Sequence, residues 1–310
     1  MRRYIICTIV TLSLLLSLAI GLSAFGIGAC ASRDRYSCGL YRFQQTKIET
    51  SAAPVDTVMF GDSSLGNDVD AKTFMHLRGK PTLNLALNGA MGFPVVYLQM
   101  QDAFEKRKVR NAIVMLSPEA FRHGFNRGAE FYVSAADGRL SLLYGVSKVV
   151  GFQSTLSLVK MLFDKDVLNA GVNRLLWNET DIGECRGCAN WDYVLQSNKH
   201  VAAGEGDLIK WQAPRDDFDP FLKRIASLCQ EYDVNCVYVH GPIMREVLDL
   251  NPTYVAKINQ KIEGAGLNLA ATDPIEIPAD EVGNAVNHVR PDLRPAYTLK
   301  VYQQVQAFLR

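Results

Sequence analysis

Short apolar runs alternate along this chain with segments in which apolar residues recur at helical spacing. Such runs, when bounded by Gly, Pro, Asn or Ser, are typical of buried strands, and the helical spacing predicts amphipathic helices. The predicted strands are residues 57–60, 81–87, 111–116, 234–239 and 267–271. The predicted helices are residues 95–104, 218–232, 252–264 and 291–309. Strands that alternate with helices favour βαβ units, so we expect an α/β fold, a three-layer sandwich around a parallel sheet.

The alternation stops between about residues 119 and 215, where the chain is rich in glycine and aromatic residues. We interpret this stretch as an insertion that covers one edge of the sheet, and hence as a candidate substrate lid. Its tryptophans are Trp177, Trp191 and Trp211. Aromatic faces suit carbohydrate rings, but packing within the lid explains these residues equally well.

The N-terminus has a different pattern from the rest of the chain. Arg2 and Arg3 precede an uncharged, largely apolar stretch from residue 4 to residue 31, which is longer than the roughly 20 residues needed to span a bilayer. The arginines would stay in the cytoplasm by the positive-inside tendency, so the remainder would face outward. We therefore expect a signal anchor at 1–31, a stalk at 32–54 and one domain at 55–310.

Two alternatives to an uncleaved anchor remain. Ala29-Cys30-Ala31 resembles a signal-peptidase site, and Ile27-Gly28-Ala29-Cys30 resembles a bacterial lipobox in which the cysteine carries lipid. The protein would then be secreted or lipid-anchored instead of spanning a bacterial inner membrane once. All three alternatives place the domain outside the cytoplasm, in the periplasm or beyond.

Cysteine usage agrees with an exported domain. Apart from Cys7 in the apolar stretch, six cysteines form three locally close pairs, which favours disulfides in an oxidising compartment. The candidates are Cys30, Cys38, Cys185, Cys188, Cys229 and Cys236. Cys185 and Cys188 have C-x-x-C spacing, but no second pair of ligands accompanies them, so a zinc site is poorly supported.

Net charge and histidine content limit the partners and cofactors that we expect. The formal net charge of the 310 residues is +1, which gives no basic surface for nucleic acid. The chain has five histidines and no cluster of histidines with carboxylates, so we expect neither a catalytic metal nor another cofactor.

The candidate catalytic residues follow the ends of the predicted strands. In an open parallel sheet the carboxyl ends of the strands share one edge, which is where ligands bind. The turns that contain Ser63, Gly89 and His240 each follow a predicted strand, so we expect these residues to lie close together. A serine at such an edge becomes a nucleophile when a histidine acts as its base.

The sequence resembles the SGNH/GDSL hydrolase superfamily in three ordered blocks. Gly61-Asp62-Ser63 is similar to the nucleophile block, and residues 84–90, which include Asn88 and Gly89, are similar to the second block. His288 lies just before the last helix, where that superfamily keeps its base. With the anchor, Gly-Asp-Ser-Ser-Leu-Gly looks like the membrane-anchored branch that acylates envelope polymers, as alginate acetylation and teichoic-acid D-alanylation proteins do.

The resemblance implies a flavodoxin-like sheet and a reaction. Ser63 would attack an acyl carbonyl with His288 as its base, and the amides of Ser63 and Gly89 would bind the oxyanion, with Asn88 as a further donor. The acceptor would be an envelope polysaccharide, and a membrane-bound O-acyltransferase would be the partner. The same chemistry would serve an esterase, and the same fold would serve an inactive accessory protein.

Two departures from the superfamily pattern concern the site. Ala285 stands where its Asp-x-x-His motif has an aspartate, so another residue must orient His288 or the site is a Ser–His dyad. The candidates for an orienting or supporting role are Asp62, Asp273, Asp280, Asn284 and His240. The third block, Gly-x-Asn-Asp, is replaced by Ser117-Pro118-Glu119, which leaves Asn88 or Asn67 as the substitute oxyanion donor.

Overall fold

A computed structural model of the chain describes residues 35–51, 54–89, 92–122 and 208–310, together with Thr11, Ser13, Leu14 and Ser17. The chain divides into two compact units, residues 1–41 with 127–186, and residues 42–126 with 187–310. In the first unit the four isolated residues are helical and residues 35–41 begin helix α2 (Arg35–Thr50). The second unit contains the sheet and every described residue of the candidate catalytic site.

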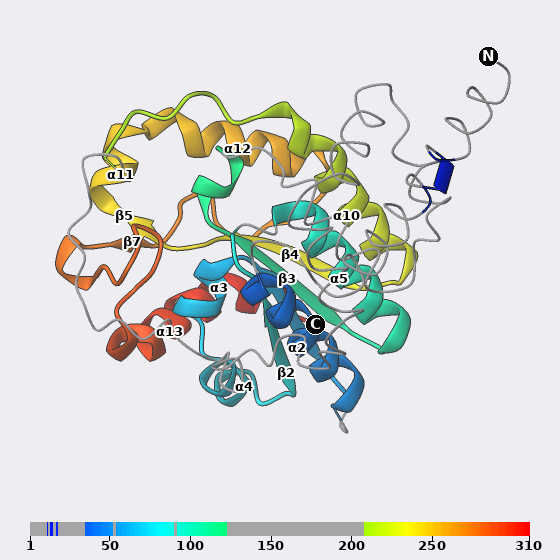
Figure 1. The fold of residues 1–310 in the computed structure, drawn as a ribbon. Helices are drawn as coiled ribbons and strands as arrows, with labels where there is room; N and C mark the ends of the chain where they lie inside the picture. The colour runs from blue at the N-terminus through cyan, green and yellow to red at the C-terminus, as the bar shows by residue number, and fades with distance from the viewer. Residues whose placement is uncertain are drawn as a thin grey trace, which may run out of the picture. The chain divides into compact units, whose positions relative to one another are not determined.

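Five parallel strands form the central sheet of the second unit, in the order β2-β1-β3-β4-β6 (Figure 1). The strands are β1 (Thr57–Gly61), β2 (Thr82–Ala86), β3 (Asn111–Leu116), β4 (Asn235–His240) and β6 (Asn268–Leu269). Each residue of β1 and β3 is buried, because helices cover both faces of a parallel sheet. The order reverses between β1 and β3, so the topological switch point, where doubly wound folds bind ligands, lies between them.

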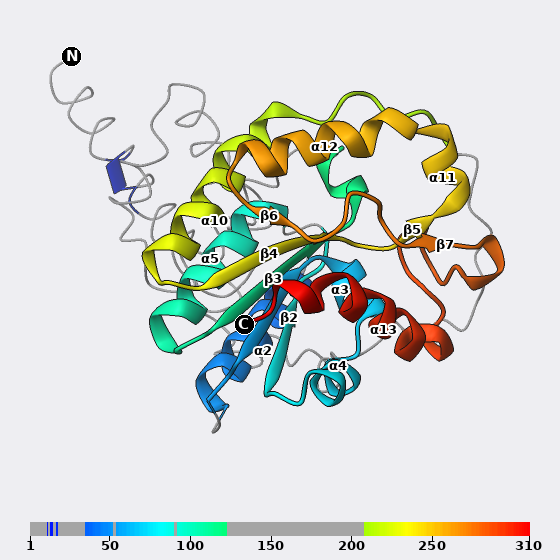
Figure 2. The same ribbon diagram turned by 180° about the vertical axis from the view of Figure 1, so that it is seen from behind.

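Helices pack on both faces of this sheet, as the alternating pattern predicted. Right-handed crossovers place α5 (Gly92–Lys106), α10 (Asp219–Glu231) and α12 (Pro252–Gly264) on one face. The crossover from β1 to β2 places α3 (Ser63–Asp68) and α4 (Ala71–Arg78) on the other face, where α13 (Arg294–Val305), which follows the last strand, packs against both. Figures 1 and 2 show α5 beside α10 on the first side and α3 beside α13 on the second. The predicted α/β class with a parallel sheet is therefore confirmed.

Several short elements were not predicted from the sequence. They are α3, α4, α11 (Arg245–Leu250) and a small parallel sheet of β5 (Ile243–Met244) and β7 (Glu276–Ile277). Short 3₁₀ turns complete the described residues: η1 (Pro118–Phe121), η3 (Asp216–Phe218), η4 (Ala279–Glu281), η5 (Pro291–Leu293) and η6 (Gln306–Phe308). Elements of two to eight residues contain too few turns or alternations to show a period.

Helix α2 occupies the segment that the sequence suggested was a stalk. Gln44 Nε2 donates to the carbonyl of Ala86 at 2.7 Å, and Lys47 Nζ donates to that of Asn84 at 2.6 Å. Because β2 is an edge strand, these side chains satisfy carbonyls that no neighbouring strand pairs with. Residues 42–50 are therefore part of the folded unit, and not a free connection to it.

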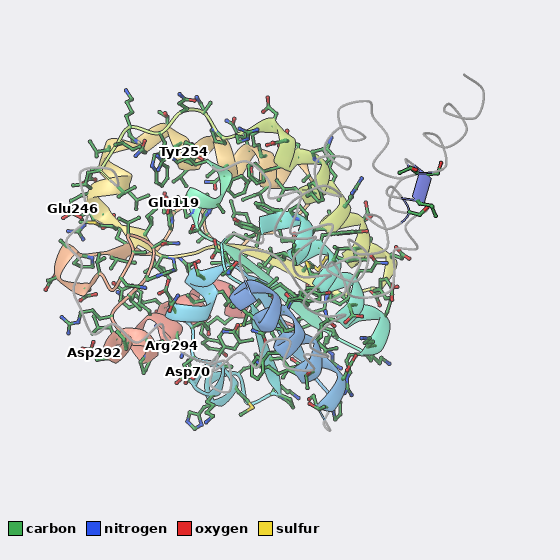
Figure 3. The ribbon with its side chains drawn as sticks, in the orientation of Figure 1. Asp70, Glu119, Glu246, Tyr254, Asp292 and Arg294 are labelled. Atoms are coloured by element: carbon green, nitrogen blue, oxygen red, sulfur yellow. A yellow bond between two sulfur atoms is a disulfide. The ribbon has the colours of Figure 1, made fainter. Side chains whose placement is uncertain are left out.

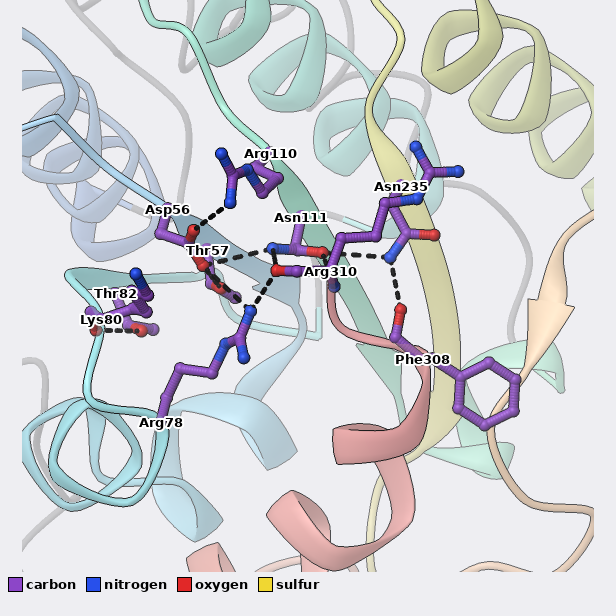
Figure 4. A network of polar contacts seen from close by, with 10 residues as sticks. All are labelled: Asp56, Thr57, Arg78, Lys80, Thr82, Arg110, Asn111, Asn235, Phe308 and Arg310. Carbon is purple, nitrogen blue, oxygen red and sulfur yellow. Dashed lines mark hydrogen bonds and ion pairs between the residues drawn. The ribbon is translucent and has the colours of Figure 1, made fainter.

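A polar network closes the amino-terminal edge of the sheet, opposite the candidate site (Figure 4). Asp56 Oδ2 accepts from Asn111 Nδ2 at 3.2 Å and pairs with Arg78 at 3.4 Å. Asn111 Oδ1 accepts from the backbone N of Arg310 at 2.9 Å and from Asn235 Nδ2 at 3.0 Å. The network thus fixes residue 310 to the start of β3 and leaves the opposite edge to the candidate site.

One predicted cysteine pair lies in the described residues with its side chains. Cys229 of α10 and Cys236 of β4 form a disulfide, with an S–S distance of 1.99 Å and a Cα–Cα distance of 6.0 Å. Cys38 lies in α2, but its side chain is outside the described part of the chain. Cys30, Cys185 and Cys188 also lie outside it, as do Trp177, Trp191 and most of the predicted insertion.

None of the described helices is long and apolar enough to cross a membrane. Of the predicted anchor, residues 1–31, the structure describes Thr11, Ser13, Leu14 and Ser17.

Candidate functional site

The turn after β1 places Ser63 at the carboxyl edge of the sheet. Asp62 caps α3, because its Oδ1 accepts from the backbone N of Ser64 at 2.9 Å. Asp62 Oδ2 accepts from the backbone N of Ser117, which follows β3, at 3.0 Å. This buried carboxylate therefore joins the ends of the two strands at the switch point and sets where α3, and with it Ser63, begins.

His288 lies against Ser63, although 225 residues separate them in the sequence. The Ser63 Oγ–His288 Nε2 distance is 2.9 Å, which is hydrogen-bond length. On the other side of the ring, His288 Nδ1 lies 2.9 Å from Asn284 Oδ1. We assign the ring proton to Nδ1 because Asn284 presents an oxygen to it, so the Nε2 lone pair faces the Ser63 hydroxyl.

The loop that carries His288 is closed by its own backbone. Gly283 N donates to the carbonyl of His288 at 2.7 Å, and Val282 pairs with Val289 in an antiparallel bridge. A Cβ on Gly283 would lie 2.8 Å from the carbonyl oxygen of Val289, so only glycine allows this close approach. The short loop therefore presents the ring in one orientation.

Burial determines the charge of His288. The residue is 6% exposed, and this desolvation lowers its pKa from 6.5 to about 4. The ring is therefore neutral at physiological pH and is able to accept a proton from Ser63. Asn284 orients the ring without supplying a negative charge, which is the chemical difference from a Ser-His-Asp triad.

We expect Asn284→Asp to move the acid limb of the pH–rate profile upward. In the native protein, the rate at which Ser63 is modified by a serine-reactive reagent should fall only as the pH approaches about 4, where His288 becomes protonated. A carboxylate on Nδ1 favours the imidazolium, so the limb should rise by about 1–3 pH units. Labelling rates between pH 3.5 and 8, with folding followed by circular dichroism, measure this. An unmoved limb would contradict the assigned role of Asn284.

Gly89 faces the nucleophile from the end of β2. A Cβ built on Gly89 would lie 3.9 Å from Ser63 Oγ, so its backbone borders the space around that hydroxyl. Asn88, the second predicted oxyanion residue, is half-buried beside it. Asn67 has a different task, since its Nδ2 donates to the carbonyl of Ser63 at 2.7 Å and holds the serine backbone.

The structure separates the candidates for orienting His288. Asn284 is the residue bonded to Nδ1. Asp62 is engaged with Ser64 and Ser117, as described above, and burial raises its pKa. Asp280 lies in η4, and its backbone carbonyl accepts from Arg290 Nη1 at 3.0 Å. No hydrogen bond joins either aspartate to His288 within the described ranges, so the carboxylate of the superfamily pattern has no counterpart on this ring.

His240 lies at the end of β4 and faces away from this pair. Its Nε2 lies 2.6 Å from Asn259 Oδ1 of α12, and its ring packs edge-on against Tyr238. The side chain is 1% exposed, and burial lowers its pKa to about 4. Asp273, the other proposed orienting residue, acts electrostatically on His240. This second His–Asn pair is therefore a buried packing contact at the same edge.

The described part of the chain contains no group of three or more His, Cys, Asp or Glu residues that could hold a metal ion. The arrangement of Ser63, His288 and Asn284 is instead suited to nucleophilic attack on a carbonyl.

No protein-family model matches this chain, and a comparison with curated proteins also finds no match.

Proposed function

We propose that this protein is an extracytoplasmic, SGNH-like O-acyltransferase that moves an acyl group, most simply acetyl, to a cell-envelope polysaccharide. The observation that carries the proposal is the 2.9 Å separation of Ser63 Oγ and Nε2 of His288, whose buried ring is neutral. The proposed superfamily rests on the resemblance of the blocks that contain Gly61, Gly89 and His288. The proposed location outside the cytoplasm and the proposed acceptor in the cell envelope rest on the apolar N-terminal segment.

The reaction proceeds in two half-reactions. Ser63 Oγ attacks the acyl carbonyl while its proton passes to His288 Nε2, and the backbone amides of Ser63 and Gly89 stabilise the oxyanion. When the tetrahedral intermediate collapses, the donor's leaving group takes the proton from His288. A sugar hydroxyl then gives its proton to His288 and attacks the acyl-serine ester. When this second tetrahedral intermediate collapses, His288 returns the proton to Ser63 Oγ, which releases the serine and the acylated polymer.

Asn284 is sufficient for this cycle. The hydrogen bond to Nδ1 keeps the imidazole in the tautomer that accepts a proton at Nε2, which is the orienting part of the aspartate's work in a triad. The missing negative charge makes the imidazolium less stable, so the base is weaker. We therefore expect slow turnover with simple esters and faster transfer when a bound donor and acceptor align the reacting atoms.

Covalent labelling tests the nucleophile. The purified protein should react with a fluorophosphonate, and peptide mass spectrometry should place the adduct on Ser63. A folded protein that is not labelled, or is labelled elsewhere, would overturn the proposal and leave an inactive accessory protein with the same fold.

Acceptor dependence separates a transferase from an esterase. Hydrolysis of a chromogenic acetyl ester should be slow alone, and an added envelope oligosaccharide should accelerate release of the chromophore while it becomes acetylated. If acetate is the main product with or without the oligosaccharide, the protein is an esterase of the same chemistry.

A further inference from the structure

Ser63 and His288 come from opposite ends of the chain, so something must hold them at hydrogen-bond distance. The Ser63 side is helix α3, whose first residue is Ser63 and whose last is Asp68. The His288 side is the loop before α13. A second contact between these two elements, besides the Ser63–His288 bond itself, would fix the geometry of the pair.

Asp68 makes that second contact. Its Oδ1 accepts from the backbone N of Val289, the residue after His288, at 2.8 Å. The side chain is 0% exposed, and its other oxygen, Oδ2, has no hydrogen-bond partner among the described residues. A carboxyl group buried with one oxygen unsatisfied is costly, so its retention calls for a compensating role.

Arg294 joins the same two elements from the other side. It is the first residue of α13, it is 5% exposed, and its Nη2 donates to the carbonyls of Gly66 at 2.8 Å and Val69 at 2.7 Å. These carbonyls belong to the last turn of α3 and to its C-cap, where a helix has unsatisfied acceptors and a negative dipole end. Figure 3 shows Arg294 where α13 begins, next to α3.

We propose that Asp68 and Arg294 are positioning residues that clamp the His288 loop to α3 and so set the Ser63–His288 distance. The inference rests on the proposed function, because it matters only if this pair reacts. In this arrangement a carboxyl group, that of Asp68, supports His288 through the backbone of the next residue, Val289. In the Asp-x-x-His pattern the supporting carboxyl group contacts the imidazole itself. By holding the loop in place the clamp also keeps His288 buried, and burial is what keeps the ring neutral.

The charges around the clamp agree with this role. Burial raises the pKa of Asp68 well above its usual value, and the nearby Asp62 adds to the rise. The bond from Val289 and the charge of Arg294 act in the opposite direction. Since burial favours the neutral form, asparagine is a close substitute for Asp68, with the same volume and an acceptor oxygen for Val289 N.

Fluorophosphonate labelling of Ser63 in four single variants tests the clamp. Asp68→Ala should lower the labelling rate per folded molecule by about 10- to 100-fold, because a displacement of about 1 Å costs up to that much. Its acid limb should also move from about 4 towards 6.5, since a loosened loop admits water to His288. Asp68→Asn should stay within about threefold of the native rate with an unmoved limb.

Asp70→Ala is the matched control. Asp70 caps α4 by accepting from the backbone N of Thr73 at 2.8 Å, so the variant loses a capping carboxylate only two residues away. It should lower stability while the labelling rate per folded molecule and the acid limb stay native. A merely structural role for Asp68 predicts this same outcome for Asp68→Ala, and that result would overturn the inference.

Arg294→Lys provides the test if Asp68→Ala does not fold. Lysine cannot keep the two bonds to Gly66 and Val69 in the same geometry, so the labelling rate should fall by about tenfold, with the same upward shift of the limb. A native rate and limb would contradict the clamp. These results are distinct from failure of the proposed function, in which the native protein itself is not labelled at Ser63.

Discussion

Replacing Ser63 with alanine is expected to abolish fluorophosphonate labelling, and His288→Ala is expected to lower the labelling rate by roughly 10⁴-fold or more. The reason is the 2.9 Å contact, in which the hydroxyl donates to a neutral imidazole and is activated by it. Without His288 the serine hydroxyl has no base. Without Ser63 the reagent has no nucleophile.

Ester turnover shows whether the two side chains act as a unit. Each single variant should lose about as much turnover as the double variant Ser63→Ala/His288→Ala, because residues of one catalytic unit are strongly non-additive. His76→Ala is the control, since His76 is exposed on α4 and the hydrogen bonds of His288 go to Ser63 and Asn284 instead. Independent, additive losses from Ser63 and His288 would show that the observed hydrogen bond is not used in the reaction.

Gly61→Ala is expected to prevent folding or to lower the free energy of unfolding by at least about 4 kcal/mol, a large part of the total for a typical domain. A Cβ on Gly61 would overlap the carbonyl oxygen of Met115 and lie 2.9 Å from its carbonyl carbon. Neither atom is able to withdraw, because Gly61 is in register with Met115 on β3 and with Ala86 on β2.

Gly264→Ala is the matched control for this prediction. Gly264 ends α12, and in the described part of the chain a Cβ there would have no neighbour within 4 Å. Alanine should therefore be neutral or stabilising by about 0.5–1 kcal/mol, through its higher helix propensity and a less flexible unfolded chain. Urea unfolding followed by circular dichroism compares the two variants. A native-like midpoint for Gly61→Ala would contradict the packing at the end of β1.

The five strands of the central sheet and the helices α5, α10, α12 and α13 follow from local pattern alone. Residues 111–116 and 252–264 have the predicted bounds, because an uninterrupted apolar run and a helical period of that length are unambiguous. Helix α2 was not predicted, because the contacts that hold it are with residues distant in the sequence. Its polar side chains Gln44 and Lys47 satisfy backbone carbonyls of β2, an edge that exists only after the strands have assembled.

The candidate site shows the same division between what local pattern predicts and what tertiary contacts decide. The sequence by itself determined that Ser63 and Gly89 follow parallel strands and share an edge, and the motif resemblance added His288. Only the tertiary structure decided that Asn284 orients the imidazole, although Asp62 and Asp280 carry the charge that such a role usually has. A side chain's distance from a ring nitrogen depends on how a loop folds back, and the spacing of residues does not encode it.

The roles of Asp68 and Arg294 are the ones that the sequence pattern predicts least. One is a polar residue at the end of a six-residue helix, and the other begins a helix more than 200 residues later. Local pattern therefore determined the elements and the edge at which chemistry gathers, because periodicity and turns are properties of neighbouring residues. The partners of the reacting groups were decided by folding, because contacts between distant segments form only when the sheet and its helices pack.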